Sequence, residues 1–309
     1  MAGGSGIRTE QRGAGSPGQG PVFQTSKTTR HFLDRVFAAL VFGATLFGLV
    51  VLGVLLVDIF RDGVPRLSWE FIRGFPSSDA ASSGIWPALL GSVWLLSITA
   101  LVSVPLGVGA AVYLEEYAAD SWLTRIVEVN ISNLAGVPSI IYGLLGLGLF
   151  VEFLRPLTGG QSIISGALTL SLLILPVIII TTREALRAIP NAVREGGYAL
   201  GATRWEIIRS HLLPMAIPGT LTGTILALSR AIGEAAPLIV VGASLYITFT
   251  PLGPRDQYGA LPIQIYDWIG RPQDEFKVLA AAGIVVLMVV LLLTNLFAIW
   301  LRSRYQRND

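Results

Sequence analysis

The stretch EGGYALGATRWEIIRSHLLP, residues 195–214, is a polar segment with two arginines in a chain that is otherwise strongly apolar. Asn191 is placed to cap a short helix that runs into this stretch, and Gly201 permits a turn that residues with a Cβ disfavour. Thr203, followed three residues later by Glu206, is the signature of a capping box at the start of a second helix. The stretch therefore predicts two helices joined by a tight turn.

The second helix of this hairpin has an apolar face, because Trp205, Ile208 and Leu212 recur at helical spacing. Pro214 and Pro218 are expected to end this helix and to lead into the next apolar segment. A hairpin of this kind can insert into a groove on a partner protein. The simpler alternative is a surface hairpin that only connects two membrane spans.

Long apolar runs surround the hairpin. Hydrophobic residues make up 52% of the 309 positions and charged residues 14%, which is too apolar for a soluble domain of this size. Five charge-free runs reach the length of about 20 residues that crosses a bilayer as a helix, namely 36–57, 80–114, 129–151, 156–182 and 278–301. A further region, 212–254, is interrupted only by Arg230 and Glu234 and is expected to be one long spanning helix. We therefore predict an all-α integral membrane protein with six transmembrane helices.

The loops between these spans carry an uneven share of the 22 Lys and Arg residues. If both termini lie in the cytoplasm, the cytoplasmic segments hold 14 of these residues and the outer loops hold seven. Cytoplasmic loops of membrane proteins are enriched in Lys and Arg, so we predict an N-in, C-in topology with the hairpin in the cytoplasm. Dividing the region 212–254 into two spans would instead move the arginine-rich C-terminus to the opposite side.

The chain is expected to form one membrane domain between two tails. Residues 1–28 are rich in Gly, Ser, Gln and Pro and contain no apolar run, which is typical of a disordered segment and not of a cleavable signal peptide. We therefore expect a disordered cytoplasmic tail at 1–32, a transmembrane domain at 33–301 that contains the cytoplasmic loop 183–214, and a cytoplasmic tail at 302–309.

The residue content excludes several kinds of site. The chain has no cysteine and only two histidines, so disulfides, thiolate catalysis and a His-rich metal site cannot form. A net charge of +2 does not suggest nucleic-acid binding. No glycine is followed by lysine, so the P-loop pattern for ATP binding is absent. We expect neither a catalytic residue nor a bound cofactor or metal in this chain.

Two charged residues lie within an apolar region. Arg230 comes twelve residues after Pro218, which is about 18 Å along a helix and close to the middle of a hydrocarbon core about 30 Å thick. Glu234 follows at i+4 on the same helix face. A charge at this depth costs on the order of 3 kcal/mol or more, so it should face a bundle interior or a water-filled path. Gly233 and Pro237 would let the helix bend or open there.

The chemistry of this pair suits an anion. Arg230 can offer a forked, charge-assisted donor to a tetrahedral anion, while Glu234 would hold the guanidinium in place and keep it from binding the anion too tightly. The alternative is a purely structural ion pair that ties two helices together.

The third span is interrupted by Gly136 and Pro138. Ser139 and Tyr142 follow this break as hydroxyl groups at membrane depth, where they could line a hydrophilic path. The alternative is that Ser139 satisfies a backbone carbonyl freed by Pro138 and that Tyr142 is a packing residue. The sequence alone leaves both interpretations open.

Together these segments resemble the phosphate ABC transporter permeases, a branch of the MetI-like binding-protein-dependent permeases, and among them the PstA subunits. The hairpin is similar to the EAA loop of this family, with Gly196 and Gly197 where alanines are usual. The other matching stretches include GVPSIIYGLLGLGLFV at 136–151 and RAIGEAAPL at 230–238. The resemblance covers roughly residues 85–300.

The resemblance implies that the chain is a non-hydrolytic permease subunit that moves phosphate inward by alternating access. The implied partners are a PstC-like sister permease, a PstB-like ATPase dimer that binds ATP and Mg²⁺, and a PstS-like phosphate-binding protein. The implied location is the bacterial plasma (inner) membrane, as a multi-pass protein. From their chemistry and depth, we expect Arg230, Glu234, Ser139 and Tyr142 to belong to the substrate pathway. The residues implied to couple the chain to the ATPase are Glu195, Gly196, Gly197, Gly201, Ala202, Thr203, Trp205, Leu213 and Pro214.

Three other functions compete with this one. A permease for sulfate, molybdate or another oxyanion is an alternative, because one buried arginine cannot choose among tetrahedral dianions. An ion-gradient-driven secondary transporter would need no ATPase partner. A membrane enzyme is disfavoured, because no cluster of His, Asp and Glu is placed for metal or acid–base chemistry.

Overall fold

The computed structural model describes residues 27–306, and this part of the chain contains no β-strand. The chain divides into two compact units, residues 1–55 and 56–309. The first unit holds most of helix α1 (Lys27–Gly63), a 37-residue helix that exceeds the thickness of a hydrocarbon core. Because α1 begins at Lys27, residues 27–32 are helical, although the composition predicts a disordered tail there. The remainder of that predicted tail, 1–26, lies outside the described residues.

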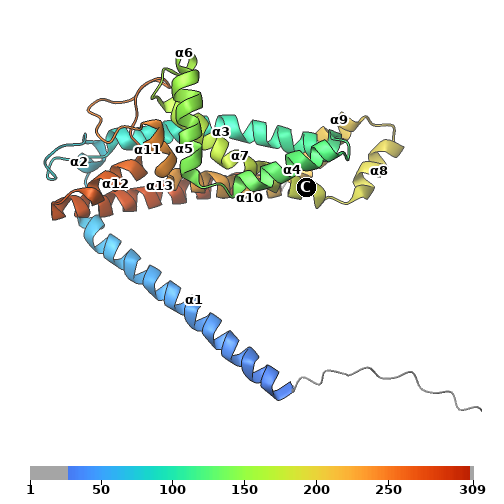
Figure 1. Ribbon diagram of the computed structural model, residues 1–309, viewed down its shortest axis with the longest axis horizontal. Coiled ribbons are helices and arrows are strands. Elements are labelled where there is room, and N and C mark those ends of the chain that lie inside the picture. Colours follow the sequence, from blue (N-terminus) through green and yellow to red (C-terminus); the bar gives the residue numbers. More distant parts are fainter. Residues whose placement is uncertain (1–26, 307–309) are drawn as a thin grey trace, which may run out of the picture. The chain divides into compact units, whose positions relative to one another are not determined.

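The second unit holds the other long helices. They are α3 (Trp86–Val112), α4 (Trp122–Ala135), α7 (Ile163–Arg187), α10 (Leu213–Gly233) and α13 (Asp274–Gln306), and the shorter α5 (Ser139–Gly146) follows α4. The short helices are η1 (Val64–Arg66), α2 (Trp69–Arg73), α6 (Arg155–Thr158), α8 (Asn191–Ala199), α9 (Arg204–Ile207), α11 (Ala236–Val241) and α12 (Leu261–Gly270). Three π-helical segments extend their neighbours, η2 (Tyr113–Tyr117), η3 (Leu147–Phe153) and η4 (Ile208–Leu212). The α8–α9 hairpin lies at one end of this unit, and α2 and α12 lie at the other (Figure 1).

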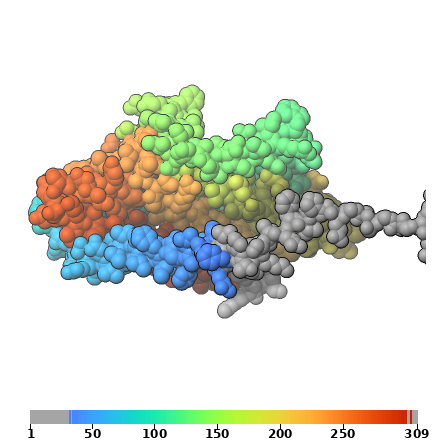
Figure 2. All heavy atoms as spheres, turned by 60° about the horizontal axis from the view of Figure 1, so that its bottom comes forward, coloured from blue at the N-terminus to red at the C-terminus, as the bar shows by residue number. Residues whose placement is uncertain are grey.

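Within residues 27–306, five helices are long and apolar enough to cross a membrane, and the bent pair α4–α5 brings the total to six if it counts as one span. The prediction of an all-α protein with about six spans is therefore confirmed. The break predicted at Gly136 and Pro138 is also present. It is sharp, because the segments 122–135 and 139–153 meet at an angle of 106°. The α4–α6 segment, coloured green, runs across one face of the unit (Figure 2).

The region 212–254 is not one long helix, and this prediction is wrong. Helix α10 ends at Gly233, because the backbone of Glu234 is extended, with φ −81° and ψ 112°. The next helix, α11, has Pro237 in its first turn and only six residues, and it ends at Gly242 in the left-handed conformation. The run is apolar apart from Arg230 and Glu234, but Gly233, Pro237 and Gly242 allow a backbone break that apolarity alone does not reveal.

Helix α7 is the central element of the second unit. It packs against α3, α4, α5 and α10, and its buried face includes Leu170, Ile174 and Ile178. Small residues let these helices approach closely: a Cβ on Gly107 of α3 would lie 2.6 Å from the Ile178 side chain. This tight packing fixes α5 and α10 against one common helix, and so positions the polar residues that they carry.

Candidate functional site

Arg230 and Glu234 form the ion pair that their spacing predicts. Arg230 lies in the last turn of α10, and its Nε donates to Glu234 Oε1 at 3.2 Å. The side chain of Arg230 is 46% exposed and that of Glu234 is 18% exposed. Among the described residues, no group accepts a hydrogen bond from the two Nη atoms of Arg230. One edge of the guanidinium therefore has no hydrogen-bond partner within the described part of the chain.

The helix opens beside this pair, as Gly233 and Pro237 predict. Helix α10 ends at Gly233, and α11 begins two residues after Glu234. Helix α5 lies against α11, since a Cβ on Gly143 would be 2.8 Å from the Cα atom of Pro237. The two stretches that the sequence singles out, 136–151 and 230–238, are thus neighbours in the fold.

Tyr142 stabilises the bend between α4 and α5. In an uninterrupted helix the carbonyl of Leu134 would accept a hydrogen bond from residue 138, but Pro138 has no N–H. The buried hydroxyl of Tyr142 donates to this carbonyl at 2.8 Å. The backbone N–H of Val137 donates to the same carbonyl at 3.1 Å, so Tyr142 adds a side-chain donor to a carbonyl that also has a backbone donor. Ser139, the half-buried first residue of α5, is not among the donors of this carbonyl.

The hairpin follows most of its local sequence signals. The Thr203 side chain accepts from the Glu206 N–H, and the Glu206 carboxylate accepts from the Thr203 N–H at 2.7 Å, which confirms the capping box. Gly201 has a φ of 81°, the left-handed turn conformation that the sequence predicts. The predicted cap at Asn191 is wrong. Pro190, with an extended ψ of 139°, precedes the helix, and Asn191 is the first residue of α8.

The two glycines at the centre of α8 have different surroundings. A Cβ on Gly196 would meet no atom within 4 Å, whereas a Cβ on Gly197 would lie 2.7 Å from the Ile207 side chain. Gly197 is therefore the point where α8 contacts α9. Gly196 faces open space, and nothing in the structure requires glycine there.

The hairpin exposes an apolar tip. Leu200 is 90% exposed, Trp205 54% and Tyr198 49%, whereas Ile208 and Leu212 are buried. The apolar face predicted to lie against the membrane or the other helices is therefore buried at Ile208 and Leu212 and exposed at Trp205. The other residues implied in coupling line the hairpin and its exit, with Glu195 and Thr203 exposed and Ala202, Leu213 and Pro214 half-buried.

The second helix of the hairpin continues into the membrane. The segment from Arg204 to Gly233 is helical over all 30 residues, so the predicted end at Pro214 and Pro218 is wrong. The π-helical turn η4 ends two residues before this segment's first proline, Pro214. A proline in a regular α-helix clashes with the carbonyl four residues before it, and the wider π turn relieves that clash. The second helix of the hairpin and the turn that carries Arg230 are therefore parts of one continuous helix.

An arginine of α8, missed in the sequence, ties the hairpin to the bundle. Arg194 Nη2 donates to Glu116 Oε1 at 2.6 Å, and both side chains are largely buried. The same guanidinium donates to the carbonyls of Leu186 and Ile189, each at 3.1 Å, at the end of α7. The sequence does contain the partners, because two glutamates follow the second predicted span and several arginines follow the fourth. The two groups lie far apart in the sequence, so it does not reveal which glutamate pairs with which arginine.

Two arginines of α7 extend this cluster. Glu115 accepts from Arg187 Nε at 2.9 Å and from Arg183 Nε at 3.3 Å. Arg183 also pairs with Glu128 of α4. These pairs join the ends of α3, α4 and α7 on the side of the hairpin.

Another polar contact lies next to the candidate anion site. The Ser229 hydroxyl donates to Asn295 Oδ1 of α13 at 2.6 Å. Interhelical hydrogen bonds of this kind help to join membrane helices. This bond therefore anchors the last turn of α10, where Arg230 lies.

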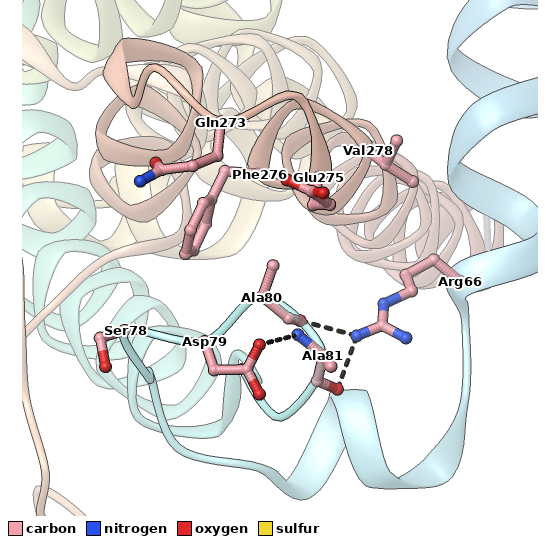
Figure 3. Close-up of a pocket in the computed structure, with 9 residues that line it drawn as sticks. All are labelled: Arg66, Ser78, Asp79, Ala80, Ala81, Gln273, Glu275, Phe276 and Val278. Carbon is pink, nitrogen blue, oxygen red and sulfur yellow. Dashed lines mark hydrogen bonds between the residues drawn. The ribbon is translucent and has the colours of Figure 1, made fainter.

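A large cavity of about 570 Å³ lies beside the loop that follows α2 (Figure 3), at the end of the unit opposite the hairpin (Figure 1). Its arginine, Arg66, points at the loop that follows α2 and donates to the carbonyls of Ala80 and Ala81 at 2.7 and 2.6 Å. This arginine holds the loop in place. The cavity is not lined by Arg230, Glu234, Ser139 or Tyr142. In the part of the chain from 27 to 306, no group of His, Asp and Glu could hold a metal ion.

Sequence comparison identifies relatives over most of the chain. Residues 103–307 match the family described as binding-protein-dependent transport system inner membrane component. A probable ABC transporter permease protein of Bacillus subtilis, YqgI, is 36% identical over 80% of this chain and 88% of its own length. The phosphate transport system permease protein PstA of Pasteurella multocida is 32% identical, covering 79% of this chain and 85% of its own. A probable PstA of Methanocaldococcus jannaschii is 30% identical over 92% of this chain and 96% of its own.

Solved structures share the fold. A bacterial alginate ABC transporter in complex with its periplasmic protein aligns with a TM-score of 0.63, covering 87% of this chain and 94% of the other at 16% identity. The inward-facing MetNI methionine ABC transporter aligns with a TM-score of 0.55 over 72% of this chain and 94% of the other, at 22% identity. The architecture is therefore that of an ABC permease.

Proposed function

Because the chain belongs to the family of binding-protein-dependent transport system inner membrane components, we propose that it is the membrane-spanning permease subunit of an ATP-driven importer of inorganic phosphate. The observation that carries this proposal is its similarity to proteins named phosphate transport system permease PstA, at 32% and 30% identity over 79% and 92% of the chain. The charged pair at the end of α10 supplies chemistry suited to that substrate.

Arg230 is the residue that contacts the anion in this proposal. Its Nε is bound to Glu234, which orients the guanidinium and offsets part of its charge. The free Nη edge can donate two parallel hydrogen bonds to two oxygens of a tetrahedral anion. The partial neutralisation by Glu234 keeps the anion from being held too tightly, as a transport site requires. Because Arg230 is half-exposed in the single chain, a sister permease resembling PstC would complete the wall of the path.

The hairpin is the coupling element. The chain has no P-loop sequence, so ATP and Mg²⁺ would be bound by a partner ATPase, two copies of a PstB-like subunit, and this chain would not hydrolyse ATP. The exposed tip at Leu200 and Tyr198 is suited to a groove on that partner, and Trp205 lies beside it against α3. The helix from Arg204 to Gly233, about 45 Å long at about 1.5 Å per residue, would carry a displacement of the tip to Arg230 as one rigid lever.

The remaining components follow from the same family relationship. A PstS-like protein would deliver phosphate on the outer side, and the hairpin would face the cytoplasm in an N-in, C-in topology. The location is then a bacterial plasma (inner) membrane. The Lys and Arg distribution supports this orientation.

The site is tested by uptake of labelled phosphate with Arg230→Ala, Arg230→Lys and Glu234→Gln, with Arg61→Ala as a matched control. Arg61 is an exposed arginine in the last turn of α1, outside both the site and the coupling hairpin. Arg230→Ala should abolish uptake, and Arg230→Lys should restore only a small part because lysine lacks the fork. Full uptake by a normally inserted Arg230→Ala protein would exclude the anion contact. If phosphate uptake stops when the ion gradient is collapsed while the ATP level is maintained, the protein would instead be a secondary transporter.

A further inference from the structure

Two cavities adjoin each other beside the hairpin. One is an apolar groove of about 550 Å³ between α3 and the helix that starts at Arg204. It lies at the ends of two candidate membrane spans, 86–117 and 204–233. Hydrocarbon and aromatic side chains dominate its lining, which includes Val104, Val108, Gly109, Tyr113, Tyr117 and Trp205. Tyrosine and tryptophan at the end of a span are typical of the membrane–water interface.

The second cavity is polar and has a volume of about 500 Å³. Three arginines line it, Arg187, Arg194 and Arg204, together with the carboxylates Glu115 and Glu116. The arginines of α7 and α8 already bind these carboxylates. In the described part of the chain, Arg204 pairs with no carboxylate. The pocket therefore has one cation in excess.

Arg204 connects the two cavities. It lines the polar pocket, and its guanidinium lies 5.5 Å above the ring of Tyr117, which lines the groove. Its Nε donates to the Tyr198 hydroxyl at 3.4 Å, which leaves its Nη groups available. An unpaired cation thus lies at the mouth of an apolar groove, at the level where interfacial aromatics are found.

We propose that this composite site binds an anionic phospholipid, with its phosphodiester at Arg204 and part of an acyl chain in the groove. Basic clusters at the end of membrane spans attract anionic lipids. An acyl chain would also cover the apolar surface of the groove, whereas a free anion bound at Arg204 would leave that surface exposed. The two carboxylates in the pocket also repel a phosphate dianion more than a singly charged phosphodiester. The lipid would contact α3 and the helix from Arg204, and so brace the hairpin against the bundle.

The groove offers a substitution that fills it without disturbing the packing. A Cβ on Gly109 would meet no atom within 4 Å, so Gly109→Leu places a side chain in the groove and not in the core. Gly148→Leu is the matched control, because Gly148 also faces open space but lies in η3, outside the groove. For the head group, Arg204→Ala is compared with Arg209→Ala.

The test is native mass spectrometry of the purified transporter complex, stripped of lipid and titrated with phosphatidylglycerol or phosphatidylethanolamine. The complex should bind phosphatidylglycerol about fivefold more tightly, the factor that corresponds to about 1 kcal/mol per basic residue near an anionic surface. Arg204→Ala should remove this preference for phosphatidylglycerol. Gly109→Leu should lower the affinity for both lipids. The two control variants should bind both lipids as the wild type does.

Two results would overturn the proposal. One is unchanged lipid binding in both Arg204→Ala and Gly109→Leu. The other is displacement of the bound anion by excess inorganic phosphate with no effect of Gly109→Leu, which would assign the pocket to free phosphate. Neither readout depends on the transported substrate, so this test is separate from that of the proposed transport function.

Discussion

Replacing Arg194 should detach the coupling hairpin from the membrane bundle. Its side chain is 18% exposed and that of its partner Glu116 is 8% exposed, so the alanine variant leaves a nearly buried carboxylate without a counter-charge. Removing one partner of a buried ion pair costs about 3–5 kcal/mol. Because Arg194 retains some solvent contact, we expect the lower end, about 3 kcal/mol. Arg194→Lys keeps the charge but loses the fork, and should cost about half as much.

The assay is thermal unfolding of the purified complex with Arg194→Ala, Glu116→Gln and the double variant. The double variant should be less destabilised than the sum of the single variants, by at least about 1 kcal/mol, because both remove the same interaction. Arg209→Ala, an exposed arginine outside the cluster, should stay within about 0.5 kcal/mol of wild type. ATP hydrolysis by the Arg194→Ala complex should continue without phosphate uptake. The reasoning is refuted if Arg194→Ala is as mild as the control, or if the two single effects simply add.

Two further substitutions test local features. Gly196→Ala should stabilise α8 by about 1 kcal/mol, whereas Gly197→Ala should cost about 1–3 kcal/mol through its contact with Ile207; equal melting temperatures for the two variants would show that the hairpin packs differently. Tyr142→Phe should lower stability by about 1 kcal/mol, because Leu134 loses its hydroxyl donor, while the affinity for transported phosphate stays within a few fold. Loss of uptake in a stable Tyr142→Phe protein would place the hydroxyl in the anion path instead.

Local signals predicted most of the local structure, although the cap at Asn191 and the helix end at Pro214 and Pro218 were predicted wrongly. The Thr203 capping box, the left-handed turn at Gly201 and the break around Pro138 depend on residues within one or two helical turns of each other. The i,i+4 pairing of Arg230 and Glu234 is of the same kind. In each case the backbone geometry depends on neighbouring side chains, so a short window of sequence contains the information.

Predictions that depended on tertiary packing were less successful. The prolines at 214 and 218 were expected to end a helix, but a π turn accommodates the first of them and the helix continues. The pairing of Arg194 with Glu116 joins residues 78 positions apart, and several acids and arginines at the same membrane face were equally plausible partners. Hydrophobic composition could not distinguish the single helix expected over 212–254 from the observed helix, break and short helix.

The most direct test of the central claim is uptake of labelled phosphate, sulfate and molybdate in cells that lack this chain, with and without the gene restored. The account predicts that only phosphate uptake fails and that restoring the gene recovers it. If phosphate entry is unaffected while another oxyanion fails to enter, the permease fold and the coupling hairpin stand, but the assignment of phosphate as the substrate is contradicted.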